Sequence, residues 1–456
     1  MLEKFFHLKE NHTDVKTEIM AGITTFMTMA YILAVNPNIL SAAGMDSKAV
    51  LIATALASFI ATALMAVLAN YPFALAPGMG LNAYFAYTVV LTMGYSWQLA
   101  LMAVFVEGVI FIALSLTNVR EGIFNAIPMT LKSAVSVGIG LFVAFVGLQH
   151  AKLIVNSDST LVTYQHFKGA TFHSVGVGAI LALLGVVITA ILLVKKVKGG
   201  ILYGILITWL LGIVCELTGI YVPDVEAGMY SVIPTAFVSF DFSALGETFG
   251  QVFKTDFSGV GLLNFFAVMF SFLFVDLFDT LGTLIGVASK ADMLDEDGRL
   301  PHIKGALMAD SIGTCVGAVL GTSTTTTFVE SASGVTEGGR TGLTAMTTGI
   351  LFLLATIFSP LFLTIPSFAT APALIIVGFY MMGSAVKIDF NDPSEGIPAF
   401  LTILAMPTAY SISEGIAIGV ISWTLINVIT GKAKEKKISP LMYVLTVLFI
   451  LKYVCL

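Results

Sequence analysis

Apolar stretches separated by short polar segments run through almost the whole chain, from about residue 19 to about residue 430. Many of them approach the length of about 20 residues that a helix needs to cross a bilayer. The pattern predicts fourteen membrane-spanning segments, at residues 19–37, 49–69, 72–94, 97–116, 130–148, 174–194, 201–219, 261–287, 304–320, 321–338, 342–364, 371–386, 396–410 and 413–430. A further apolar piece at 440–455 follows a lysine-rich run, and we expect it to lie along the membrane surface.

Two of these segments, the third and the tenth, are interrupted. The third contains Ala76-Pro-Gly-Met-Gly80, and the tenth contains the run Gly321-Thr-Ser-Thr-Thr-Thr-Thr-Phe-Val-Glu330. Consecutive β-branched residues favour an extended backbone, which is tolerated at membrane depth only where it is buried in protein or lines a polar cavity. With seven segments in each half, the two halves would be inverted relative to one another. Paired interruptions in inverted halves indicate the substrate site of a secondary transporter.

The distribution of basic residues supports this count of segments. With the amino terminus inside, the fourteen segments place eighteen of the 22 lysines and arginines on the cytoplasmic side, and four outside: Lys48, Lys152, Lys168 and Lys254. An excess of lysine and arginine on the cytoplasmic side is the rule for membrane proteins. We therefore predict a multi-pass protein of the cell membrane with both termini in the cytoplasm.

Composition agrees, because 57% of the 456 residues are hydrophobic, 11% are charged and the mean hydropathy is +0.95. Cys215, Cys315 and Cys455 are far apart, so neither a disulfide framework nor a metal cluster is predicted. The sequence has no Walker motif and no recognisable set of nucleophile and base, so we expect neither an enzyme nor a cofactor. The net charge of −6 gives no reason to expect a nucleic-acid partner.

Ionisable residues inside apolar segments are costly and are therefore functional candidates; here they are Glu107, Asp276, Asp279, Asp310 and Glu330. Helical spacing places Asp276, Asp279 and Thr283 along one side of the eighth segment. Two carboxylates so close in a low dielectric are not expected both to be ionised. They could therefore take up and release a proton, which is the minimum that proton coupling requires.

Other candidates lie at the two interruptions. Glu330 could accept hydrogen bonds from adjacent N–H groups of a ligand, and the ring of Phe328 could stack on a flat heterocycle. Structural alternatives remain for several residues. Asp276, Glu107 and Asp310 could hydrogen-bond neighbouring helices, and Asn82 could cap the half-helix after the third segment's break.

Four motifs resemble those of the AzgA-like purine permeases of the nucleobase-ascorbate transporter superfamily. They are Gly22-Ile-Thr-Thr-Phe-Met-Thr-Met-Ala-Tyr-Ile-Leu-Ala-Val-Asn-Pro37, Ala76-Pro-Gly-Met-Gly-Leu-Asn-Ala-Tyr-Phe85, Val275-Asp-Leu-Phe-Asp-Thr-Leu-Gly-Thr283 and Gly321-Thr-Ser-Thr-Thr-Thr-Thr-Phe-Val-Glu-Ser331. The resemblance implies a fold like the uracil permease, in which the extended pieces of the third and tenth segments pair. It also implies a cytoplasmic segment (1–18), a core domain (19–128 and 259–368), a gate domain (129–258 and 369–431) and a carboxyl-terminal tail (432–456).

The resemblance further implies import of a purine base, guanine or hypoxanthine, with adenine as the alternative, by proton symport with alternating access. Substrate would contact Asp279, Glu330, Phe328, Asn82, Thr327 and Thr283, and proton coupling would involve Asp276, Asp279 and Glu330. Thr283 stands where the uracil-permease branch has a histidine, so a histidine-based proton relay is not implied. Relatives are often dimeric, which makes a homodimer possible here.

A rival interpretation is an anion carrier or channel, because sulfate and bicarbonate carriers resemble this fold. The acidic character of the proposed cavity argues against that alternative.

Overall fold

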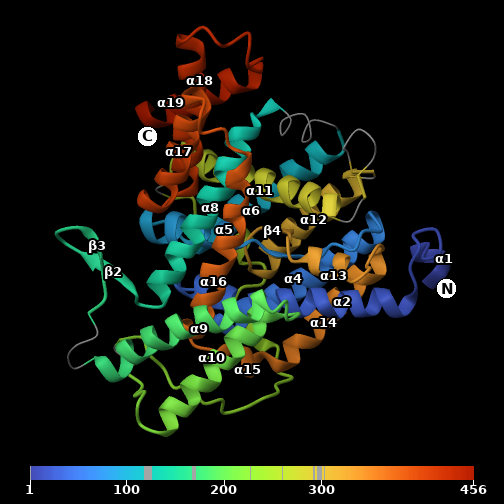
Figure 1. The fold of residues 1–456 in the computed structure, drawn as a ribbon, viewed down its shortest axis with the longest axis vertical. Coiled ribbons are helices and arrows are strands. Elements are labelled where there is room, and N and C mark those ends of the chain that lie inside the picture. The colour runs from blue at the N-terminus through green and yellow to red at the C-terminus, as the bar shows by residue number, and fades with distance from the viewer. Residues whose placement is uncertain are drawn as a thin grey trace.

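The computed structural model describes residues 2–117, 126–166, 171–225, 227–258, 260–290, 293–294, 300–301 and 303–455, and over these ranges the chain is mainly helical (Figure 1). Arg120, Lys168 and Arg299, which the orientation prediction counts, lie outside the described residues. The first half contains α1 (Leu2–Phe6), α2 (Val15–Met29), α3 (Ile32–Ser41), α4 (Ser47–Leu68), β1 (Leu75–Pro77), α5 (Met79–Ala83), the π-helix η1 (Tyr84–Thr92), α6 (Trp97–Ser115), α8 (Met129–His150), β2 (Ile154–Ser157), β3 (Leu161–Tyr164), η2 (Phe172–Gly176), α9 (Val177–Val194) and α10 (Gly200–Leu217).

The second half begins after two short 3-10 helices, η3 (Ser243–Glu247) and η4 (Gln251–Lys254). It contains α11 (Leu262–Lys290), α12 (Ile303–Leu320), β4 (Thr325–Thr327), α13 (Ser331–Thr336), α14 (Gly342–Ala355), η5 (Thr356–Phe358), α15 (Ser359–Thr364), α16 (Ser367–Met381), η6 (Met382–Lys387), α17 (Pro393–Thr408), α18 (Ile412–Ile429) and α19 (Pro440–Cys455).

Eleven helices of the described residues are long and apolar enough to cross a membrane, which confirms a multi-pass membrane protein. They match the predicted segments except for the two interrupted ones and 396–410. The predicted segment 396–410 corresponds to α17, which has 16 residues. The count of fourteen segments and the seven-plus-seven inverted repeat stay predictions.

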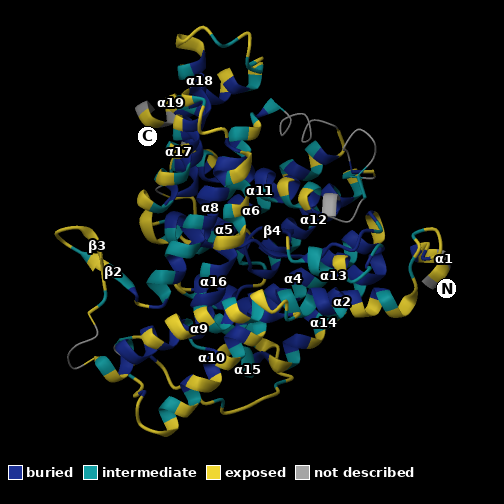
Figure 2. Ribbon diagram, in the orientation of Figure 1, coloured by how far each residue is buried: buried dark blue, intermediate teal, exposed yellow. Residues whose placement is uncertain are grey.

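The helices pack in two main groups. In one, α4 packs against both α12 and α14, and α12 also packs against α6; in the other, α8 packs against α16 and α17, and α17 against α18. Helices α9 and α10 pack against each other, and many of their residues are exposed, as the yellow parts of their ribbons in Figure 2 show. Apolar side chains on the outside of a helix bundle are what a lipid environment favours.

Strands β1 and β4 lie among these helices, near the centre of the molecule, and every residue of both strands is buried (Figures 1 and 2). They pair antiparallel, with Leu75 opposite Thr327, Ala76 opposite Thr326 and Pro77 opposite Thr325. Each of the two breaks predicted from the sequence therefore contains an extended strand, and the two strands pair as the resemblance implies.

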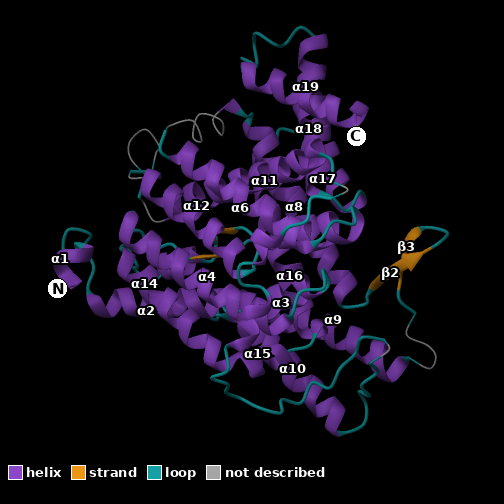
Figure 3. Ribbon diagram, turned by 180° about the vertical axis from the view of Figure 1, so that it is seen from behind, coloured by secondary structure: helices purple, strands orange, loops and turns teal. Residues whose placement is uncertain are grey.

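A second pair of strands, β2 and β3, forms a hairpin that projects from the side of the molecule (Figures 1 and 3). Another connection, which carries η3 and η4, packs against the end of α12. The Thr248 hydroxyl donates to the Leu320 carbonyl at 2.9 Å, and the Gly250 N–H donates to the Val319 carbonyl at 2.8 Å. These bonds satisfy carbonyls that the end of a helix leaves without partners. Gly321 follows with φ +98°, in the region that favours glycine.

Candidate functional site

The pairing of β1 with β4 brings two distant parts of the chain side by side in the interior of the protein. We call this buried pair of strands, with the residues directly around it, the β1–β4 crossing. Hydrogen bonds extend it at both ends, since the Gly78 N–H donates to the Thr324 carbonyl and the Phe328 N–H to the Ala74 carbonyl, each at 3.0 Å. A short helix follows each strand: α5 starts at Met79 and α13 starts at Ser331. The crossing therefore holds two helix starts beside two extended strands inside a helical protein.

Helix α11 presents Asp279 to this crossing. The Thr326 hydroxyl of β4 donates to Asp279 Oδ2 at 3.1 Å, and the Asp279 side chain is only partly buried. Gly78 makes this approach possible, because a Cβ there would lie 2.7 Å from Thr326 Cγ2 and 3.3 Å from Asp279 Oδ2. The carboxylate thus accepts from one hydroxyl and keeps further lone pairs that a ligand could use.

Glu330 lies just beyond β4 and receives a hydrogen bond that the sequence analysis did not foresee. The Tyr31 hydroxyl, from the junction between α2 and α3, donates to Glu330 Oε1 at 2.7 Å. Tyr31 is only 1% exposed, whereas Glu330 is partly exposed. Asp279 lies close enough to interact electrostatically with both residues. Tyr31 stands in one of the motifs quoted above, but its partner is 299 positions away, so local spacing gave no sign of the contact.

The remaining predicted site residues are more buried than Asp279 and Glu330 or lie one helical turn away from Asp279. Asn82 is fully buried, donates to the Pro77 carbonyl at 3.3 Å and accepts from the Ser323 hydroxyl, so it ties the two breaks together. Phe328 is 6% exposed and packs in the apolar core. The Thr327 hydroxyl is buried without a hydrogen-bond partner among the described residues. Thr283 is partly buried, one turn after Asp279.

Comparisons with known proteins agree with this architecture. A profile of the Permease family matches residues 16–418. The chain belongs to the Permease family. This membership confirms the predicted relationship to nucleobase-ascorbate transporters and makes the protein a transporter rather than an enzyme.

Two relatives and one solved structure illustrate the relationship. The permease is 47% identical over 466 residues to the guanine/hypoxanthine permease PbuG of Bacillus subtilis (strain 168), and the match covers 100% of each chain. It is 42% identical over 454 residues to the adenine permease AdeP of Escherichia coli (strain K12), covering 100% of this chain and 96% of the other. The transmembrane domain of the cyanobacterial bicarbonate transporter BicA has the same fold, with a TM-score of 0.63 at 15% identity, covering 89% of the permease and 97% of that chain.

Asp276 makes different contacts from Asp279, which lies three positions later on α11. Asp276 is fully buried, and its Oδ1 lies 2.8 Å from the Thr280 hydroxyl. The same hydroxyl lies 2.9 Å from Asp310 Oδ1 on α12. Glu107 of α6 accepts from the Thr324 hydroxyl at 3.1 Å. The permease thus has a second group of carboxyls, Glu107, Asp276 and Asp310, which we call the buried carboxyl cluster.

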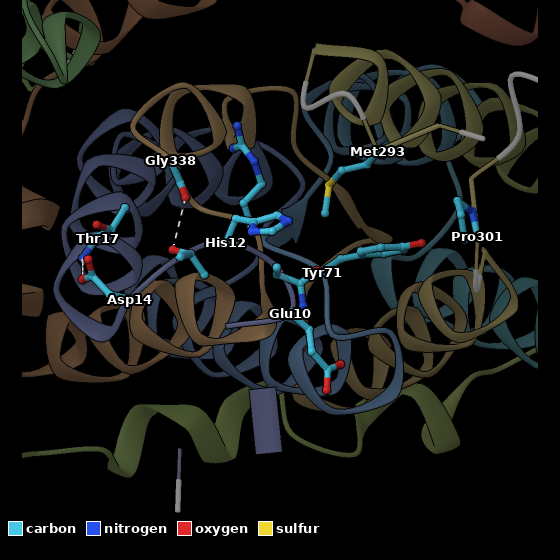
Figure 4. A pocket seen from close by; sticks show the side chains of 11 residues that line it. Glu10, His12, Asp14, Thr17, Tyr71, Met293, Pro301 and Gly338 are labelled. Atoms are coloured by element: carbon cyan, nitrogen blue, oxygen red, sulfur yellow. Dashed lines mark hydrogen bonds between the residues drawn. The ribbon is translucent and has the colours of Figure 1, made fainter. Parts of the chain in front are cut away.

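An open cavity of ≈ 840 Å³ lies elsewhere, between the amino-terminal segment and the turn before α14 (Figure 4). His12, Tyr71 and Arg340 are among the residues that line it. None of the predicted substrate or proton residues lines this cavity. We therefore place the candidate site of the permease at the crossing of β1 and β4.

Proposed function

We propose that the permease imports a purine base together with protons, and that guanine and hypoxanthine are its substrates. The observation that carries the proposal is the pair of partly exposed carboxylates, Asp279 and Glu330, each held by a hydroxyl donor beside the β1–β4 crossing. Carboxylates accept hydrogen bonds, so they suit a ligand with N–H groups along one edge. The proposal assigns Asp279 and Glu330 as acceptors, with Phe328, Asn82, Thr327 and Thr283 completing the site.

The edge of the purine distinguishes guanine and hypoxanthine from adenine. Guanine carries an N–H on its six-membered ring next to an exocyclic amine, and hypoxanthine carries the same ring N–H. Adenine has an unprotonated ring nitrogen at that position, which a carboxylate would repel. The relative with guanine/hypoxanthine in its name is 47% identical, against 42% for the adenine permease, which supports the same order. Adenine transport is the alternative.

An anion carrier is the other alternative, since a bicarbonate transporter shares the fold. A site for an anion needs cationic side chains or N–H donors that are not already bonded. Asp279 and Glu330 would instead repel a bicarbonate or sulfate ion. Chloride or sulfate currents without added purine would favour this alternative.

In the proposed cycle the core domain moves as a body against the gate domain, and Asp276, Asp279 and Glu330 take part in proton coupling. Cytoplasmic termini, residence in the cell membrane and assembly as a homodimer belong to the same proposal. The helix starts at Met79 and Ser331 would add the partial positive charge of their N–H groups to the site.

The test is uptake of radiolabelled hypoxanthine by cells that lack their own purine permeases. We expect uptake that unlabelled guanine competes for strongly and adenine weakly, and that a protonophore abolishes. Asp279→Ala and Glu330→Ala should eliminate uptake while the protein still reaches the membrane, and Glu247→Gln, on the exposed η3, serves as the control. Normal uptake by both site variants would refute the assignment, and stronger competition by adenine would establish the alternative substrate.

A further inference from the structure

The buried carboxyl cluster contains more hydrogen-bond contacts than its hydroxyl groups can supply with protons. Glu107, Asp276 and Asp310 come from three helices, α6, α11 and α12, and all three residues are 0% exposed. An ionised carboxylate can only accept hydrogen bonds. Each contact inside the cluster therefore needs a hydrogen from a hydroxyl or from a protonated carboxyl.

The Thr280 hydroxyl gives the first part of the argument. Its oxygen lies 2.8 Å from Asp276 Oδ1 and 2.9 Å from Asp310 Oδ1, both hydrogen-bond distances. A hydroxyl has one hydrogen, so it donates to only one of the two carboxyls at a time. The other contact is a hydrogen bond only if that carboxyl carries a proton and donates it to the threonine oxygen.

Glu107 gives the second, independent part. Its Oε2 accepts from the Thr324 hydroxyl, but its buried Oε1 has no hydrogen-bond donor among the described residues. The Glu107 and Asp276 carboxyls also interact electrostatically with each other. Two buried ionised carboxylates would repel each other without screening by water, whereas a proton on either one removes this repulsion.

We propose that the buried carboxyl cluster is a proton-binding site, occupied by at least one proton shared among Glu107, Asp276 and Asp310 at neutral pH and in the absence of substrate. This site is separate from the substrate carboxylates Asp279 and Glu330. Other titratable groups face it, among them the Cys315 thiol of α12 near Glu107 and Asp279 of α11 near Asp310. The assignment gives Glu107 and Asp310 a functional role in place of helix packing.

One extended segment connects this site with the proposed substrate site. Thr324 donates to Glu107, and Thr326, two residues later, donates to Asp279. Side chains two apart in an extended chain point to the same side. A shift of β4 on substrate binding would therefore move donors at both sites together. This coupling rests on the proposed function, whereas the presence of the proton does not.

The experiment is infrared spectroscopy of the purified protein in lipid nanodiscs at pH 7 without nucleobase. We expect a carbonyl-stretch band from a protonated carboxyl, which weakens in Glu107→Gln, Asp276→Asn and Asp310→Asn. Thr280→Val, which leaves the carboxyls in place, should shift the band because it removes a hydrogen-bond partner. Glu247→Gln, on the exposed η3, should leave it unchanged.

Three results would overturn the proposal. One is the absence of the band in the wild-type protein at pH 7. A second is a band lost in Asp279→Asn or Glu330→Gln but kept in the cluster variants, which would place the proton at the substrate site. The third is a band that appears only when choline replaces sodium, which would show a metal cation in the cluster. None of these results depends on transport, so a failure of the proposed function would be recognised separately by the uptake assay.

Discussion

The Tyr31 hydroxyl donates a hydrogen bond of 2.7 Å to Glu330 Oε1 and joins the junction of α2 and α3 to the end of the second break. Tyr31 is almost completely buried, so its ring has little freedom to move. The bond fixes one oxygen of the carboxylate, and in the proposed site the other oxygen would accept from the ligand. Tyr31 is in this sense a positioning residue for Glu330.

Tyr31→Phe should therefore weaken substrate binding more than it slows transport. A hydrogen bond to a charged group contributes about 1.5–3 kcal/mol, so KM for hypoxanthine should rise about tenfold or more with a smaller change in the maximal rate. Tyr71→Phe is the matched control, because the buried Tyr71 hydroxyl has no hydrogen-bond partner among the described residues. Equal KM values for the two variants would show that the Tyr31 bond does not position Glu330.

Thr326 and its neighbour Thr325 offer a comparison within one strand. Thr326→Val removes the donor to Asp279, while Thr325→Val removes a hydroxyl without a hydrogen-bond partner among the described residues. We expect hypoxanthine uptake to fall about tenfold or more in the first variant and to change little in the second. Thr326→Ser, which keeps a hydroxyl, should restore most of the uptake. The same loss in both valine variants would point to packing and not to the bond with Asp279.

Gly78 should tolerate no side chain. In Gly78→Ala the new Cβ would lie 2.7 Å from Thr326 Cγ2, so β4 or Asp279 must shift. Overpacking of this kind costs about 1–3 kcal/mol, and we expect reduced thermal stability together with loss of uptake. Gly246→Ala is the control, because a Cβ there meets nothing within 4 Å. Normal uptake by Gly78→Ala would mean that the crossing adjusts without harm to the site.

The carboxyl-terminal tail is tied to α17 by a charged cluster. Lys436 Nζ lies 2.9 Å from Asp392 Oδ2 and 2.9 Å from Glu395 Oε1. Hydrogen bonds from Lys436, then from Ser394, hold the pKa of Asp392 below its ordinary value. A depressed carboxyl pKa stabilises the fold fully above the unfolded-state value of about 4, and this contribution is lost as the pH falls through the folded-state pKa.

Lys436→Met should consequently lower the Tm slightly at pH 7, and the difference from wild type should narrow as the solution is acidified. High salt should narrow it as well, because the cluster is at the surface. Lys434→Met, which changes an exposed lysine of the same run, should leave the Tm unchanged. A difference that grows in acid would contradict the predicted sign.

The sequence predicted the elements that carry local signals. The threonine run was expected to be extended, and Thr325–Thr327 form β4. The Pro77–Gly80 interruption was expected to break the third segment, and the chain changes there from β1 to α5. The pairing of the two strands came only from the resemblance, because nothing local to either break specifies its partner. Apolar length predicted fourteen spans, and eleven of them match helices of the described residues that are long enough to cross a membrane. The 16-residue α17 is shorter than a typical span.

The side chains were harder to predict, because their partners are distant in sequence. Helical spacing put Asp276 and Asp279 on one side of α11, but the two hydroxyls that they meet, Thr280 and Thr326, come from different elements. Glu107 and Asp310 looked like packing residues, since the sequence could not show that they meet Asp276. Asn82 donates to the Pro77 carbonyl, and its role in substrate binding stays a prediction. The roles of the predicted site residues stay proposals.

The most direct measurement is calorimetric titration of hypoxanthine into the purified permease in lipid nanodiscs. We predict binding by the wild-type protein and by the Glu247→Gln control, and no detectable binding by Asp279→Asn or Glu330→Gln that remain folded. Wild-type affinity in both of these variants would contradict the central claim that Asp279 and Glu330 bind the purine.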